Sequence, residues 1–125
     1  MIRVLEKYFA ISWIFTILIA LFIFYMSSRT FKGVGGKGYL SYIYHFSIFF
    51  ILALFLLISI IKGNLKNNHL VIAIIIAILY GISDEIHQFF VPGRYPSFVD
   101  VITNSVGILL AGVIYAIILL FRRNS

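Results

Sequence analysis

The sequence contains no cysteine, and this absence excludes disulfide bonds and thiolate metal sites. Charged residues are also scarce. They make up 11% of the 125 residues, whereas soluble domains contain about 25%. Hydrophobic residues account for 62% of the chain. This composition excludes a soluble globular domain and is typical of an integral membrane protein.

Acidic residues are the scarcest charged type, with four Asp and Glu against ten Lys and Arg and a net charge of +6. The basic residues fall mainly in the predicted loops and tails. Positive charge in such places indicates contact with lipid headgroups rather than with nucleic acid. We therefore expect membrane lipids as partners and no nucleic-acid partner. The residues identify no cofactor and no oligomeric state.

Four apolar runs, each near the ~20 residues that cross a bilayer, predict four transmembrane helices. They cover residues 8–25, 40–61, 69–90 and 99–121. The connections between them are short, so neighbouring helices are expected to run antiparallel. The sequence therefore predicts an all-α integral membrane four-helix bundle that forms a single domain over residues 1–125.

The distribution of Lys and Arg predicts the orientation of this bundle. The side that holds both termini and the middle loop carries Arg3, Lys7, Lys62, Lys66, Arg122 and Arg123. The opposite side carries Arg29, Lys32, Lys37 and Arg94. Because positive charge is enriched on the cytoplasmic side of membrane proteins, both termini are predicted to be cytoplasmic.

The end of the third predicted span is unusually polar. Three of the four acidic residues, Asp84, Glu85 and Asp100, fall within seventeen positions, and the first two lie in an apolar run. Ionisable groups at membrane depth are costly and mark functional sites. At 1.5 Å rise per residue, Asp84, His45 and Asn104 each lie about 7–9 Å from the middle of their helices toward the same end. We expect a polar cleft there, at the outer face.

Helical spacing assigns two buried faces. Ala77, Gly81, Asp84 and Gln88 share one face of the third helix, and Asp100, Asn104, Gly107 and Ala111 share one face of the fourth. Small residues at such spacing allow helices in membranes to approach closely. We therefore predict that the third and fourth helices pack together through Gly81, Gly107 and Ala111, below the polar cleft.

The connection between these helices contains two local signals. Pro92 and Gly93 fit the central positions of a type II turn, which would present Arg94 over the cleft. Ser97 and Asp100 have the spacing of a capping box at the start of the fourth helix. Capping alone is one interpretation of these last two residues.

Glu85 points about 100° away from Asp84 on the third helix, since successive helical residues rotate by that angle. The two carboxylates are therefore not expected to share one proton. Glu85 is expected to meet Arg94, Arg29 or another helix instead.

The stretch YGISDEIHQFFVPGR at residues 80–94, followed by Asp100, Asn104 and Gly107, resembles the signature of VanZ-like membrane proteins. Ser27-Ser28 and His45-Phe46 are also similar to that family. Many members carry an Asp-Lys pair shortly before this histidine, but this chain has Ser41-Tyr42, so no role for that lysine carries over. The resemblance implies a multi-pass protein of the bacterial plasma membrane and cell envelope, linked to resistance to the glycopeptide teicoplanin.

The first hypothesis is an enzyme acting on a lipid-linked or amphiphilic envelope substrate. Its acid/base residues would be Asp84, Glu85 and His87. Its substrate-binding residues would be Arg94, Gln88, Asn104, Asp100, His45 and Arg29. One alternative is a non-catalytic protein that binds and sequesters a lipid or lipoglycopeptide. Another is a structural or assembly protein whose polar residues only fix helix packing.

No metal is assigned among these residues. The spacing of Glu85 and His87 does not fit the H-E-x-x-H pattern of zinc proteases. A site made of a carboxylate and a histidine, with His45 or Asp100 as further ligands, stays open as an alternative.

Overall fold

The computed structural model describes residues 1–30 and 38–124. The helices in these ranges are α1 (Ile2–Lys7), α2 (Phe9–Ser27), α3 (Tyr39–Ile61), α4 (Asn67–Phe89) and α5 (Phe98–Arg123). Four of them, α2 to α5, are long and apolar enough to cross a membrane. The all-α fold and the four predicted spans are confirmed, and every span boundary lies within two residues of the prediction.

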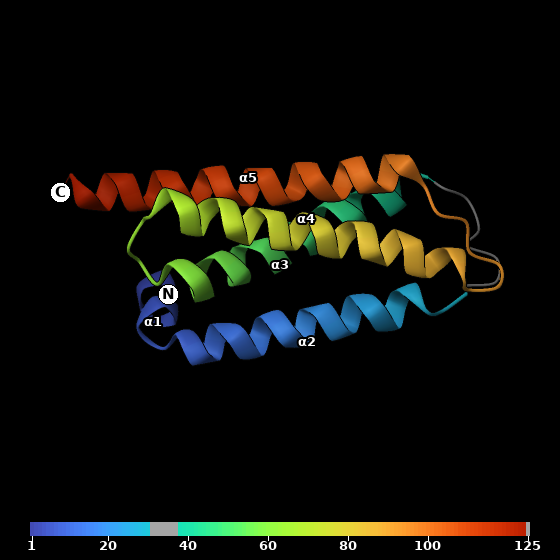
Figure 1. Cartoon of the computed structure of the whole chain (residues 1–125), viewed down its shortest axis with the longest axis horizontal. Coiled ribbons are helices and arrows are strands. Elements are labelled where there is room, and N and C mark those ends of the chain that lie inside the picture. The colour runs from blue at the N-terminus through green and yellow to red at the C-terminus, as the bar shows by residue number, and fades with distance from the viewer. Residues whose placement is uncertain (31–37, 125) are drawn as a thin grey trace.

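The four long helices run side by side along the long axis of the molecule (Figure 1). Both termini lie at one end, together with α1 and the connection from α3 to α4. We call this the terminal end. The last turn of α2, the start of α3 and the connection from α4 to α5 lie at the opposite end, which we call the cleft end. This is the antiparallel order that short connections predicted.

The surface of the bundle is apolar, as expected for helices that face lipid. Large side chains such as Ile14, Leu79 and Leu110 are exposed on three different helices. In contrast, the buried side of α2 includes the small polar residues Ser12 and Thr16. Their hydroxyl groups donate to backbone carbonyls, Ser12 to Leu5 and Thr16 to Ser12. These two hydroxyl groups therefore point inward and are satisfied by the backbone.

The closest packing in the bundle is between α3 and α5, which share its most extensive interface. A Cβ atom added to Gly107 of α5 would overlap the backbone carbonyl oxygen of Phe46 in α3. Gly81 of α4 lies against Phe49 of α3 and Asn104 of α5. The prediction that Gly107 packs α5 against α4 is therefore wrong, because α3 lies along the small-residue face of α5.

The terminal end contains a polar cluster that the sequence did not suggest. The first residues form the short helix α1, and its Glu6 accepts hydrogen bonds from Arg122 at 2.9 and 3.1 Å and from the Tyr115 hydroxyl at 2.8 Å. The side chain of Glu6 is only 9% exposed. One carboxylate thus joins the first and last helices of the chain.

Replacing Glu6 with alanine is expected to destabilise the terminal end. The substitution removes these bonds and leaves the buried Tyr115 hydroxyl without its partner, at a cost of roughly 2 kcal/mol. The melting temperature of the detergent-purified protein measures this effect. Arg123→Ala is the matched control because Arg123 is exposed. Equal melting temperatures for Glu6→Ala and Arg123→Ala would contradict this assignment.

Candidate functional site

Three of the four carboxylates of the chain are buried at the cleft end. Asp84 and Glu85 come from α4, and Asp100 comes from the first turn of α5. None of the three residues is more than 6% exposed. Because burying a carboxylate is costly without polar partners, the groups around these residues decide what this end of the bundle can do.

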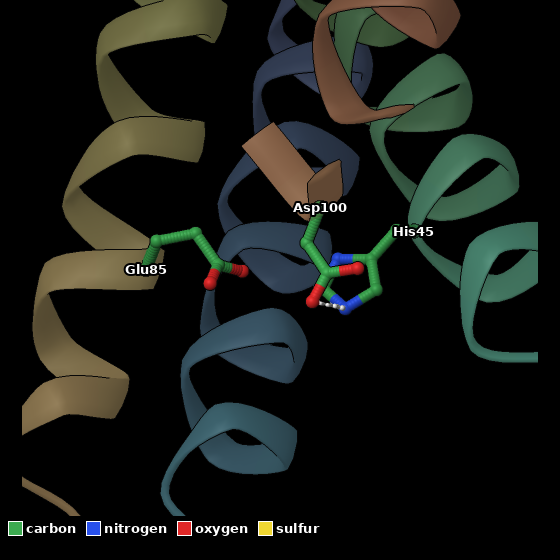
Figure 2. Close-up of side chains that lie close together, drawn as sticks. All are labelled: His45, Glu85 and Asp100. Carbon is green, nitrogen blue, oxygen red and sulfur yellow. Dashed lines mark ion pairs between the residues drawn. The ribbon is translucent and has the colours of Figure 1, made fainter. Parts of the chain in front are cut away.

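His45 of α3 lies against two polar residues of α5. Its Nδ1 atom is 3.0 Å from Oδ1 of Asn104, and its Nε2 atom is 3.8 Å from Oδ2 of Asp100, the contact marked by the dashed line in Figure 2. The amide oxygen only accepts hydrogen bonds, so the N–H on Nδ1 is the donor. The prediction that His45 and Asn104 lie at the same depth is confirmed.

Glu85 caps the start of α5 from a neighbouring helix. Its Oε2 atom accepts a hydrogen bond from the backbone N–H of Ser97 at 2.9 Å. Ser97 is the N-cap residue of α5, but its side chain makes no capping bond. In a capping box, the carboxylate three residues later, here Asp100, would accept this N–H. The predicted capping box is therefore wrong: Glu85 takes that place, which leaves Asp100 beside His45.

Gln88 links the two adjacent carboxylates of α4. Its Nε2 atom donates to Oδ2 of Asp84 and to Oε1 of Glu85, each at 3.3 Å. The two carboxylates point to different partners, since Glu85 also binds the start of α5. One amide group therefore bridges both acids.

The connection from α4 to α5 contains the predicted type II turn. Gly93 has a φ of 79°, and the backbone N–H of Arg94 donates to the carbonyl three residues earlier at 3.1 Å. Thr30 donates to the carbonyl of Pro92 at 2.6 Å, and Arg94 donates to the carbonyl of Arg29 at 3.1 Å. The turn is thus fixed against the chain that follows α2.

A cleft of about 440 Å³ opens between these elements. Five of the predicted site residues line it: His45, Asp84, Gln88, Arg94 and Asp100. Its remaining wall is partly apolar and includes Ile23, Met26 and Leu40. Glu85 and Asn104 lie behind this lining, where they bind residues that the cleft exposes. The cleft therefore presents both charged and apolar surface.

Two predicted site residues face away from the cleft. The Nε2 atom of His87 is 2.9 Å from the Ser28 hydroxyl, and its ring stacks on Phe24 with 4.6 Å between centroids. The guanidinium group of Arg29 lies 5.6 Å from the ring centroid of Tyr25. Both contacts are to the end of α2 and the residues after it. Neither residue lines the cleft.

The cleft end also holds unpaired polar atoms. Among the described residues, four buried side-chain atoms have no hydrogen-bond partner: Ser27 Oγ, Tyr44 Oη, Asp100 Oδ1 and Asn104 Nδ2. Ser27, Tyr44 and Asp100 line the cleft. Buried polar groups are nearly always paired, and all four of these exceptions lie at the cleft end. Ser27 and Tyr44 were not among the predicted site residues, although Tyr44 adjoins His45 and Ser27 ends the first span.

The fold and the cleft define a class: a multi-pass helical membrane protein with a polar cleft at one end of the bundle. A family model described as VanZ/LLP1 matches residues 9–120. The chain belongs to this family. Comparison with curated proteins and with solved structures gives no match.

Proposed function

We propose that the protein binds a lipid-linked or amphiphilic substrate of the bacterial cell envelope in the polar cleft and acts on it. The observation that carries the proposal is the environment of Arg94. Its side chain lines the cleft, and its only hydrogen bond within the described residues goes to the uncharged carbonyl of Arg29. A guanidinium group that forms no salt bridge with a carboxylate of the described residues is suited to a phosphate or carboxylate headgroup.

The shape of the cleft supports an amphiphilic ligand. Arg94 and the unpaired hydroxyl groups of Ser27 and Tyr44 offer contacts to a polar headgroup. The apolar part of the lining, with Ile23 and Met26, offers contacts to the start of an acyl or polyprenyl chain. A ligand with both parts would bury apolar surface and satisfy polar atoms in one site.

Asp84 is the residue best placed for acid/base chemistry on such a ligand. It lines the cleft beside Ser27, and its carboxylate accepts a long hydrogen bond from Gln88 at 3.3 Å. A weakly bound carboxylate in a cleft remains available to exchange a proton with a substrate. His87 receives no such role in the proposal, since its ring packs against Phe24.

Binding without chemistry is the second candidate function. The unpaired atoms of Ser27 and Tyr44 favour it, because hydroxyl groups can hold a ligand without any proton transfer. Sequestration of a lipid or lipoglycopeptide would then account for a link with teicoplanin resistance. We propose the bacterial plasma membrane as the location, with both termini in the cytoplasm.

Arg94→Ala is expected to weaken binding of an anionic headgroup at least ten-fold. A hydrogen bond to a charged group contributes about 1.5–3 kcal/mol, and ten-fold corresponds to the low end of that range. Binding is measured by the rise in melting temperature of the detergent-purified protein with phosphatidylglycerol, a polyprenyl phosphate or teicoplanin. Phosphatidylcholine serves as the ligand without net charge.

Arg29→Ala is the matched control, since it removes a neighbouring guanidinium group that lies outside the cleft lining. It should bind each ligand as the wild type does. An equal loss of binding in both variants would show that positive surface charge in general, and not Arg94 in the cleft, attracts the ligand. A lack of stabilisation of the wild type by every anionic ligand would overturn the proposed function.

A further inference from the structure

Three potential metal ligands converge at the cleft end, each from a different helix. One side-chain donor atom each from His45, Glu85 and Asp100 lies within 4.8 Å of the others. All three residues are only 4% exposed. In Figure 2 the carboxylate of Asp100 lies between the Glu85 side chain and the His45 ring. The cluster is therefore buried and brought together by the tertiary fold.

The contacts within the cluster favour a bound cation. Since Nδ1 of His45 donates to Asn104, the Nε2 atom of a neutral ring carries a lone pair, and this atom faces Asp100 at 3.8 Å. Two hydrogen-bond acceptors, Nε2 of His45 and Oδ2 of Asp100, then face each other at a distance too long for a hydrogen bond. The other oxygen of Asp100, Oδ1, is buried without a partner. A cation between these atoms would satisfy all of them.

The hydrogen bonds to the side chains of this cluster resemble those that hold metal-binding side chains in place. The ring of His45 is oriented by Asn104 through the nitrogen that faces away from the cluster. Glu85 is held by the backbone N–H of Ser97 and by Gln88. Partners of this kind fix the orientation of metal-binding side chains. The capping role of Glu85 thus also holds its carboxylate beside Asp100.

We propose that His45, Glu85 and Asp100 bind a divalent transition-metal ion, with Zn²⁺ and Mn²⁺ as the best fit. Two carboxylates balance the charge of such an ion, and a nitrogen donor disfavours Ca²⁺ and Mg²⁺, which prefer oxygen. Donors at ~2.0–2.2 Å from a tetrahedral ion lie about 3.3–3.6 Å apart, so separations of up to 4.8 Å need to shorten by as much as about 1.5 Å. The site shares His45 and Asp100 with the cleft lining but does not use Arg94, on which the ligand proposed for the cleft depends.

The position of the cluster also determines which coordination position of the ion would stay free. His45 and Asp100 line the cleft, whereas Glu85 lies behind it. Three protein ligands leave a fourth position free on a tetrahedral ion. That position would face the cleft.

The experiment uses the full chain, purified in detergent with any affinity tag removed and treated with a chelator. Zn²⁺ or Mn²⁺ is then added alone, and its stoichiometry and affinity are measured by calorimetry. We expect one ion per chain, and at least a ten-fold loss of affinity in Asp100→Asn. His69→Gln is the matched control, because His69 lies near the first residues of α4, at the other end of that helix.

A second measurement leaves His45, Glu85 and Asp100 unchanged, so it does not depend on whether a variant of these residues folds. The chain has three histidines, so the double variant His69→Gln/His87→Gln retains only His45. Electron paramagnetic resonance of bound Mn²⁺ should show coupling to a ¹⁴N nucleus in this variant. The absence of stoichiometric metal binding, the absence of nitrogen coupling, or full affinity in a folded Asp100→Asn variant would each overturn the proposal. None of these results would affect the test with Arg94→Ala, which adds no metal.

Discussion

Of the glycine-to-alanine substitutions in the helices, Gly107→Ala is expected to destabilise the protein most. The new Cβ would overlap the carbonyl oxygen of Phe46, which is a backbone atom and cannot move without shifting α3. Overpacking of this kind costs typically ~1–3 kcal/mol, and the upper part of that range is expected when backbone must move. The readouts are folded yield and melting temperature in detergent.

Gly112→Ala provides the matched control on the same helix. Its Cβ would lie 2.9 Å from Cδ1 of Ile74, which is the end of a flexible side chain. A rotamer change should relieve this contact at little cost. If Gly112→Ala lowered the melting temperature as much as Gly107→Ala, the close approach of α3 and α5 would not be the cause.

Asp84→Asn is expected to reduce turnover about 10²–10⁴-fold if the protein is an enzyme, while ligand binding is retained. Asparagine has nearly the same shape, and its amide oxygen can still accept the bond from Gln88. The substitution therefore keeps the shape of the side chain but removes its negative charge and its ability to exchange a proton, and the factor is that of a general acid or base. Turnover is measured by mass spectrometry of whichever anionic ligand stabilises the wild type.

His87→Ala is the comparison for Asp84→Asn, because the sequence analysis gave both residues an acid/base role. The ring of His87 packs on Phe24, so its removal should leave turnover largely intact. Turnover that survives Asp84→Asn but not His87→Ala would reverse the assignment. A wild type that binds the ligand and never converts it would leave sequestration as the function.

The sequence predicted those features that depend on local spacing. The four apolar runs defined the spans, and the faces of Asp84 with Gln88 and of Asp100 with Asn104 are buried as helical periodicity requires. Pro92 and Gly93 dictated the turn because proline fixes one backbone angle and glycine allows a positive one. These are properties of the residues and their immediate neighbours.

The spacing of residues in the sequence could not predict features that depend on how the helices are rotated relative to one another. The bond from Ser97 to Glu85 replaces a local capping bond with one between helices. His87 lies toward α2 because of how α4 packs, although its distance along the chain from Asp84 suggested the cleft. Glu6 and Arg122 are more than a hundred residues apart, so nothing local pairs them.

The most direct test of the central claim is to locate a bound anionic lipid on the protein. A phosphatidylglycerol analogue with a diazirine beside its phosphate would be irradiated with the protein in phosphatidylcholine nanodiscs, and labelled residues mapped by mass spectrometry. The account predicts labels at residues 26–30, 39–45 and 93–95, which fall sharply in Arg94→Ala. Labels confined to the terminal end, or spread over the outward faces and unchanged in Arg94→Ala, would contradict it.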